Sequence, residues 1–187
     1  MEKILYPERG QWPALTQRAT IAQQDLLQLA GTIFKDIENN GDKAAQKYCR
    51  LYDKTEAPVN RISEEQINKA SALIPDNLKQ AIQLAADNIE RFHAAQQAQE
   101  QVIETTTGVY CWRESRAIDT VGLYIPGGSA PFFSSVLMLG IPAKLAGCER
   151  ILLCSPPDRQ GAIHPAILYA AKLAGITAIF GIGGIQA

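Results

Sequence analysis

Residues 118–155 read IDTVGLYIPGGSAPFFSSVLMLGIPAKLAGCERILLCS, and strand-like and helix-like hydrophobic patterns alternate along them. The alternation continues beyond residue 155, and glycines or prolines mark the boundaries: Gly147 and Gly175 follow helices, and Pro165 begins one. The predicted elements are, in order, strand 118–125, helix 134–146, strand 150–155, helix 165–173 and strand 177–180. This βαβαβ order predicts an α/β fold with parallel strands and right-handed crossovers.

Two details of this unit carry structural expectations. The strand Arg150–Ser155 reads RILLCS without alternation, which is typical of a strand buried on both faces of a sheet. Pro142 lies inside the first helix, where it removes a backbone donor. We therefore expect that helix to be split into two shorter pieces.

Charge and glycine are distributed unevenly along the chain. Residues 1–116 hold 30 charged residues and 117–187 hold 7, whereas 4 glycines precede residue 117 and 10 follow it. Solvated helices carry many charges, and a buried sheet joined by glycine turns carries few. The predicted organisation is a mainly helical N-terminal region, 1–116, followed by a nucleotide-binding-like βαβαβ region, 117–187.

Four local patterns predict helices in the N-terminal region, and one predicts an extended segment. The first helix is predicted by the helical spacing of Leu26, Ala30, Ile33 and Ile37 before Gly41, and the second by Asp42 as the cap of a helix with Ala45, Tyr48 and Tyr52 inward. The capping box of Ser63 and Gln66 predicts the start of the third. The fourth is predicted to run from Pro75 to about Gln97, with the apolar stripe Leu78, Ile82, Ala85, Ile89 and Phe92, and the extended segment lies around Gly108.

Composition excludes several classes of protein. The chain has 187 residues, 47% of them hydrophobic and 20% charged, which rules out wholesale disorder. The net charge of −1 argues against a nucleic-acid-binding protein. The uncharged run Thr120–Ala143 is long enough to span a membrane, but its three prolines and four glycines argue against a span, and the N-terminus has no signal-peptide pattern. Four cysteines without a CxxC pair predict reduced thiols and a cytoplasmic protein.

The turn PGGSAP is a candidate ligand site. Glycines after a strand let a ligand approach the backbone, and the following helix start could hold an anion with Ser129, Ser134 and Ser135. Ligands of open α/β sheets bind beyond the carboxyl ends of the strands. A tight loop with a helix cap explains the same residues equally well.

A second glycine turn, GIGGIQA, occupies residues 181–187. It does not match the dinucleotide fingerprint G-x-G-x-x-G, because Gln186 stands at the third glycine position. The Gln186 amide would lie at the carboxyl edge of the sheet, where it could contact a ligand. The alternative is a surface glutamine at the start of a helix.

Other reactive side chains are weak candidates for catalysis. His93 belongs to a helix and His164 precedes a proline at a helix start, and neither has a second histidine at ligand spacing. Cys148 and Cys154 flank a strand as small hydrophobes do. No Ser-His-Asp or Cys-His arrangement can be assembled from the sequence.

The block VGLYIPGGSAPFFSSVLMLGIPAKLAGCERILLCSPP and the later AAKLAGITAIFGIGGIQA resemble histidinol dehydrogenase. The upstream segments NNGDKAAQKYCRLYDKTEAP and LKQAIQLAADNIERFHAAQ resemble the same family, so the likeness covers nearly the whole chain. The resemblance implies an aldehyde-dehydrogenase-like, incomplete Rossmann-like α/β fold. It also implies oxidation of L-histidinol to L-histidine in two NAD-dependent steps, one zinc ion per site, and a homodimer.

The resemblance also assigns site residues. Tyr124 of GLYIPGG and Gln186 of GGIQA match family positions that contact NAD, and Pro126, Gly127 and Gly128 would shape the same pocket. The family's zinc ligands, its glutamate–histidine pair and its substrate-binding residues match no position in this chain. Family members are roughly twice as long, so we expect an N-terminal fragment that is inactive alone. Two alternatives are a non-catalytic dimerisation or regulatory module, and another aldehyde-dehydrogenase-like oxidoreductase.

Overall fold

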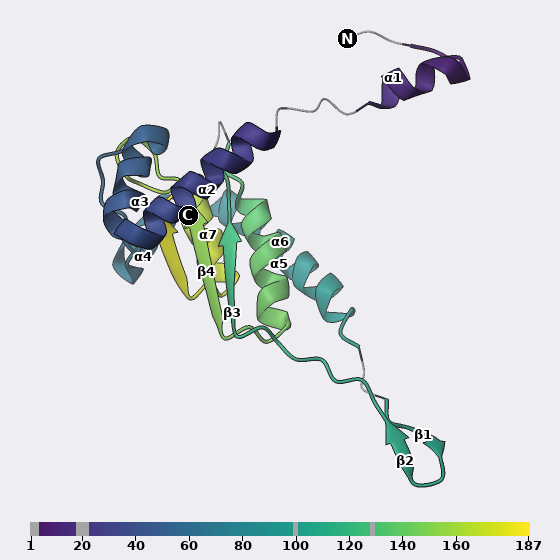
Figure 1. Cartoon of the computed structure of the whole chain (residues 1–187). Coiled ribbons are helices and arrows are strands. Elements are labelled where there is room, and N and C mark those ends of the chain that lie inside the picture. Colours follow the sequence, from purple (N-terminus) through teal and green to yellow (C-terminus); the bar gives the residue numbers. More distant parts are fainter. Residues whose placement is uncertain (1–3, 18–22, 99–100, 128–129) are drawn as a thin grey trace.

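The computed structural model describes residues 4–17, 23–98, 101–127 and 130–187. Its centre is the predicted βαβαβ unit (Figure 1). The elements of this unit are β3 (Thr120–Tyr124), α6 (Phe133–Leu145), β4 (Arg150–Ser155), α7 (Pro165–Leu173) and β5 (Ala178–Gly181). The strands are parallel in the order β3-β4-β5, with Tyr124 opposite Cys154 and Ser155 opposite Gly181. The α/β fold class is therefore confirmed, with the carboxyl ends of all three strands at one edge.

The helix containing Pro142 is not split, so that expectation is wrong. α6 is continuous from Phe133 to Leu145. Pro142 begins the last turn of the helix, so its missing N–H removes one backbone bond near the end and leaves the earlier turns intact. Beyond the helix, Gly147 takes a φ of +88°, as a residue that follows a helix C-terminus commonly does.

β4 is fully buried on one face only, which corrects the expectation of burial on both. Ile151, Leu153 and Ser155 are buried, whereas Leu152 and Cys154 are half-buried. The buried face contacts the main hydrophobic core, which helices α4 to α7 build. On the other face, Cys154 and Phe180 pack against Ala45, Cys49 and Ile182 near the carboxyl edge.

The main core also includes side chains from the N-terminal region. α4 (Glu64–Ala72) begins with the predicted capping box, in which Ser63 accepts from the Gln66 amide. α5 (Asp76–Ala94) contributes Ile82 and Ala86 to the core, but Phe92 is 64% exposed and the helix ends before Gln97. The stripe prediction is therefore wrong for its last turn. The division at residues 116 and 117 stays a prediction, because the two regions share this core.

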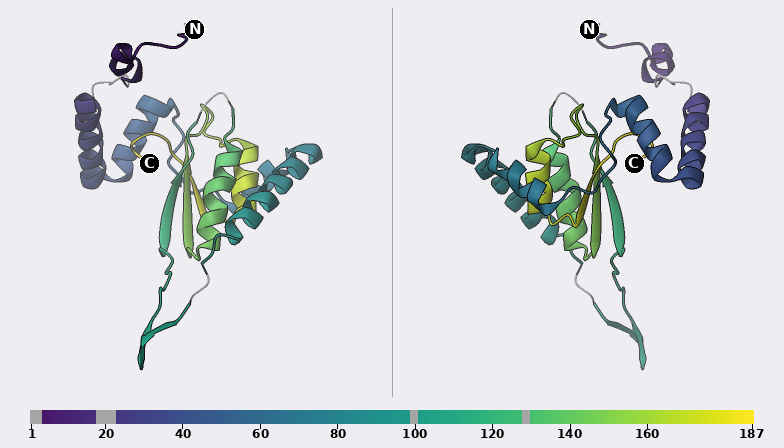
Figure 2. Two further views of the ribbon diagram at one scale, coloured as in Figure 1. Left: turned by 90° about the vertical axis from the view of Figure 1, so that its right-hand side faces the viewer. Right: turned by 90° about the vertical axis from the view of Figure 1, so that its left-hand side faces the viewer.

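The first part of the chain forms a smaller helical layer on the opposite side of the sheet from α5 to α7 (Figure 2). Its elements are α2 (Gln23–Asn40), α3 (Asp42–Tyr48) and the π-helical turn η2 (Cys49–Asp53). The 3₁₀ turn η1 (Arg9–Gln11) and α1 (Trp12–Thr16) lie apart from this layer (Figure 1). Gly41, rather than Asp42, occupies the N-cap of α3. Tyr52 is 44% exposed and stacks on Tyr48 instead of facing inward.

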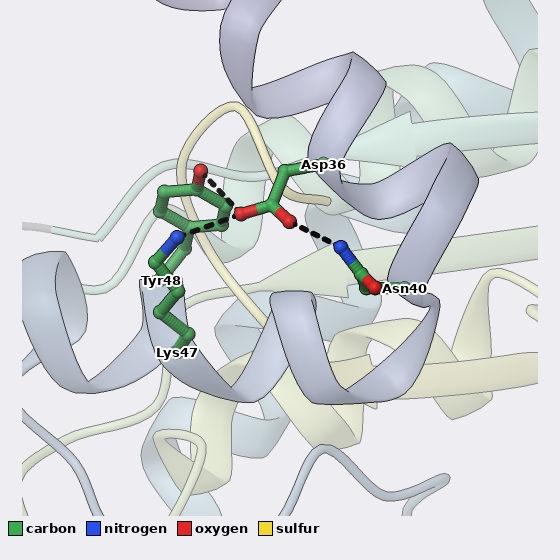
Figure 3. Close-up of polar contacts among 4 residues, drawn as sticks. All are labelled: Asp36, Asn40, Lys47 and Tyr48. Atoms are coloured by element: carbon green, nitrogen blue, oxygen red, sulfur yellow. Dashed lines mark hydrogen bonds and ion pairs between the residues drawn. The ribbon is translucent and has the colours of Figure 1, made fainter.

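A polar cluster joins α2 to α3 (Figure 3). The Asp36 carboxylate accepts hydrogen bonds from Lys47 Nζ at 2.7 Å, Tyr48 Oη at 2.8 Å and Asn40 Nδ2 at 2.7 Å. These three donors favour the charged form and lower the pKa of Asp36 to about 2. The cluster aligns the two helices above the small apolar contact of Ile33, Ala44 and Tyr48.

The extended residues around Gly108 form a hairpin of β1 (Ile103–Thr106) and β2 (Val109–Cys111). The hairpin projects from the body of the molecule, and every one of its residues is exposed (Figure 1). No helix among the described residues is long and apolar enough to cross a membrane.

Candidate functional site

The candidate site lies at the carboxyl edge of the sheet, where the segments after β3, β4 and β5 meet around Pro156. A Cβ atom on Gly127 would lie 2.7 Å from Pro156 Cγ, and one on Gly183 would collide with Pro156 Cβ. Only residues without a side chain fit these two close approaches. Of the predicted pocket, Gly128 and Ser129 lie outside the described residues.

Tyr124, the last residue of β3, is joined to the segment after β5. Its side chain is 43% exposed, and its hydroxyl oxygen accepts a hydrogen bond of 2.9 Å from the Gly184 amide. Gly184 has a φ of +67°, a conformation that favours glycine. The phenol ring is therefore fixed at its tip while much of its surface remains accessible.

Gln186 is buried, with 5% of its surface exposed, so the alternative of a surface glutamine is wrong. Its Nε2 donates to Asp53 Oδ2 at 3.2 Å. Its Oε1 is buried and has no hydrogen-bond partner among the described residues. A buried carbonyl without a donor is costly, and a donor on a bound molecule would satisfy it.

Asp53, the last residue of η2, completes this arrangement and was missed by the sequence analysis. Its Oδ2 also accepts from the Gly183 amide at 3.2 Å. Asp53 stands within the quoted segment NNGDKAAQKYCRLYDKTEAP, but no local pattern distinguishes it. Its partners lie 130 and 133 positions away, beyond the reach of any spacing argument.

The thiols near the site are not activated. Burial, and then the neighbouring Asp53 carboxylate, raise the pKa of the Cys49 thiol to about 11. Burial also raises the pKa of Cys154. A raised pKa leaves less of the nucleophilic thiolate at neutral pH, so these cysteines act as small hydrophobic side chains here.

Neither histidine is bonded to Tyr124 or Gln186 in the described part of the chain, although His164 lines a cavity at the same edge. His164 caps α7, where its Nδ1 accepts from the Ala166 amide at 3.2 Å. His93 lies on α5 with its Nδ1 2.9 Å from Gln96 Oε1. In the part of the chain that the structure describes, no three His, Cys, Asp or Glu side chains gather as metal ligands would.

A cavity of about 620 Å³ lies on the helix side of the same edge. Its lining is mostly apolar and includes Gly127, Ser155, Ile163 and residues of α4. Ser155 Oγ is buried and has no partner among the described residues. Tyr124 and Gln186 are not among the residues that line the cavity. The edge therefore offers two separate features: a mostly apolar cavity with an unpaired hydroxyl, as small-molecule sites commonly have, and the contacts of Tyr124 and Gln186.

Comparisons with known proteins converge on one family. The histidinol dehydrogenase family profile matches residues 16–187. Histidinol dehydrogenase from Bacteroides thetaiotaomicron is 48% identical over the whole chain, and that from Salmonella typhimurium is 45% identical over 92% of it. These alignments cover 44% and 39% of the two relatives, so the chain spans less than half their length. The crystal structure of histidinol dehydrogenase from Elizabethkingia anophelis superposes with a TM-score of 0.89 at 53% identity, covering 96% of this chain and 42% of that one.

Proposed function

The chain belongs to the histidinol dehydrogenase family, and from this we propose that it contributes the NAD-contacting edge of an enzyme that oxidises L-histidinol to L-histidine. The observation that carries the proposal is the buried, unpaired carbonyl of Gln186, two residues after the glycine that is bonded to Tyr124. We infer the reaction from the family, and we infer from the Gln186 carbonyl which part of this chain contacts the cofactor.

The residues at the edge fit NAD. Gly127, Gly183 and Gly184 let Pro156, Asp53 and Gln186 of this chain pack closely at the edge, which brings the segments after β3 and β5 together there. The half-exposed ring of Tyr124 offers apolar area, and the Gln186 carbonyl accepts one hydrogen bond from a hydroxyl or amide of the cofactor. NAD, when bound, supplies the hydride acceptor for each of the two oxidations.

Within the described residues, nothing fits the family's zinc ion, because no three candidate ligands gather. No step is therefore assigned to zinc here. At the edge, His164 and Asp158 line the cavity. His164 Nδ1 accepts from the Ala166 amide, and Asp158 Oδ1 accepts from the Gln160 and Ala162 amides. We expect the 187-residue chain to bind cofactor without turning over histidinol by itself.

A homodimer in the cytoplasm is the setting we propose for this activity. The β1–β2 hairpin supports a second copy as partner, because it projects from the body (Figure 2) and exposes several large apolar side chains. Val102, Ile103, Tyr110 and Trp112 are each more than half exposed there. Apolar surface of this kind marks an interaction site on soluble proteins.

A calorimetric titration of the purified chain with NAD tests the cofactor role. We expect saturable binding that is lost in Tyr124→Ala and retained in Tyr110→Ala, which removes an exposed tyrosine from the distant hairpin. Absence of binding up to millimolar NAD would contradict the proposal, as would equal binding by Tyr124→Ala.

A further inference from the structure

Asp53 fixes a segment of the candidate site from a distant part of the sequence. We propose that Asp53 is a positioning residue for the cofactor site, whose carboxylate sets the conformation of Gly183–Gln186 and the direction in which the Gln186 amide points. The proposal rests on the proposed function for its ligand, but the contacts that carry it involve this chain alone.

The direction of the Gln186 amide follows from the chemistry of its partner. A carboxylate only accepts hydrogen bonds, and Asp53 Oδ2 receives one from Gln186 Nε2. Rotating the amide by half a turn would place Gln186 Oε1 against Asp53 Oδ2, two acceptors with no proton between them. Asp53 therefore keeps the nitrogen of the amide inward and leaves Oε1 without a protein donor.

The backbone of the segment is held by the same oxygen atom. Asp53 Oδ2 accepts from the Gly183 amide at 3.2 Å, while Tyr124 Oη accepts from the Gly184 amide at 2.9 Å. The successive amides of Gly183 and Gly184 are thus bonded to side chains from two distant parts of the sequence. The carboxylate packs directly on Gly183, since a Cβ atom there would lie 2.7 Å from Asp53 Oδ1.

Asp53 is itself held by an unusual stretch of backbone. It ends the π-helical turn η2, a rare conformation that is frequent at functional sites. Lys54 follows with a φ of +55°, which is uncommon for a residue other than glycine. Next to it, Thr55 is buried, and its hydroxyl accepts from the Ala57 amide at 3.2 Å.

The carboxylate oxygens of Asp53 serve as hydrogen-bond acceptors. Across the described residues, no lysine, arginine or histidine forms an ion pair with it. Its carboxylate accepts from an amide of the backbone and an amide of a side chain, and the Cys49 thiol is a further neighbour. Asp53 therefore acts through hydrogen bonds of fixed direction. These bonds are lost when a substitution removes the acceptor oxygens.

Amide hydrogen exchange on the ¹⁵N-labelled 187-residue chain, without any ligand, tests whether Asp53 fixes the segment Gly183–Gln186. In Asp53→Ala we expect the Gly183 amide to exchange at least about tenfold faster and the Gln186 side-chain amide to take the shifts of an unbonded glutamine. The amides of β4 should keep their wild-type exchange rates. Unchanged Gly183 and Gln186 signals would overturn the proposal, and so would an equal acceleration throughout β4.

Asp87→Asn is the matched control. Asp87 also receives a glutamine amide bond, from Gln83 Nε2 at 2.7 Å, but on the exposed face of α5. It should leave Gly183 and Gln186 unaffected. An effect there as large as that of Asp53→Ala would overturn the proposal.

NAD affinity separates a positioning role from one that merely supports the fold. We expect Asp53→Ala to weaken NAD binding about tenfold and Asp53→Asn, which keeps one acceptor oxygen, to weaken it less. Equal affinity in wild type and Asp53→Ala would overturn the positioning role while the cofactor function stands. If wild type itself binds no NAD, the proposed function fails for this chain, and the exchange result alone decides whether Asp53 holds the segment.

Discussion

Tyr124 and Gly184 stand 60 positions apart, yet the hydroxyl oxygen of Tyr124 accepts a 2.9 Å hydrogen bond from the Gly184 amide. The bond joins the end of β3 to the segment after β5, across the whole width of the three-stranded sheet. It therefore ties Tyr124 to the segment that contains Gln186, the other residue that the family resemblance assigns to the cofactor.

Removing this hydroxyl should loosen the site by a measurable amount. Tyr124→Phe keeps the ring but loses the acceptor, so we expect the free energy of unfolding to fall by about 0.5–1.5 kcal/mol. Urea unfolding measures the change, with Tyr110→Phe on the exposed hairpin as the control. A Tyr124→Phe midpoint equal to that of wild type would show that the bond adds no stability.

The Asp36 cluster predicts a particular dependence of stability on pH. The pKa of Asp36 lies at about 2 in the folded chain, below the usual 3.8. The stabilisation of the folded chain by the ionised carboxylate is therefore complete above pH 3.8 and is lost as pH falls toward 2. We expect Asp36→Asn to unfold at lower urea than wild type at pH 7. The two midpoints should approach each other through that acidic window, and a constant difference would contradict this assignment.

The four cysteines should react with iodoacetamide in an order that their environments set. Cys111 is exposed on the hairpin, whereas Cys49 is 1% exposed and its pKa is raised to about 11. We expect Cys111 to be alkylated first at pH 8 and Cys49 last, because the thiolate is the reactive form. Mass spectrometry of timed digests gives the order. In urea the difference between the sites should disappear, and early labelling of Cys49 in the folded chain would contradict its burial.

Gly140 of α6 should tolerate no side chain. A Cβ atom there would lie 2.9 Å from Ala174 Cβ and 3.1 Å from Ile176 Cδ1, so Gly140→Ala forces α6 and the end of α7 apart. We expect a net loss of about 1–3 kcal/mol from overpacking, despite the better helix propensity of alanine. Gly31→Ala is the control, since α2 leaves open space at that position, and it should gain about 0.5–1 kcal/mol. Equal effects of the two substitutions in thermal unfolding would contradict the packing argument.

Local patterns were sufficient for most of the elements. The bounds of β4 and α7 agree with the prediction, because a proline begins α7 and glycines follow both α6 and α7. Phe92 shows the limit of periodicity. Spacing defines one face of α5, but it does not show how far along the helix the covering surface extends.

The candidate site was less accessible to sequence reasoning. Tyr124 and Gln186 were assigned through a family resemblance, and the sequence alone left Gln186 undecided between a ligand contact and a surface position. Gln186 is buried, and its side chain is bonded to Asp53, 133 positions earlier. A contact of that separation leaves no mark in local spacing, so the three-dimensional structure was needed to find it.

The long separation between Asp53 and Gln186 also orders the events of folding. During synthesis, Asp53 is made more than a hundred residues before either of its partners. Closing so large a loop carries an entropic cost that favours late formation of these bonds. We therefore expect the two bonds of Asp53 to form late in the folding of residues 53–186.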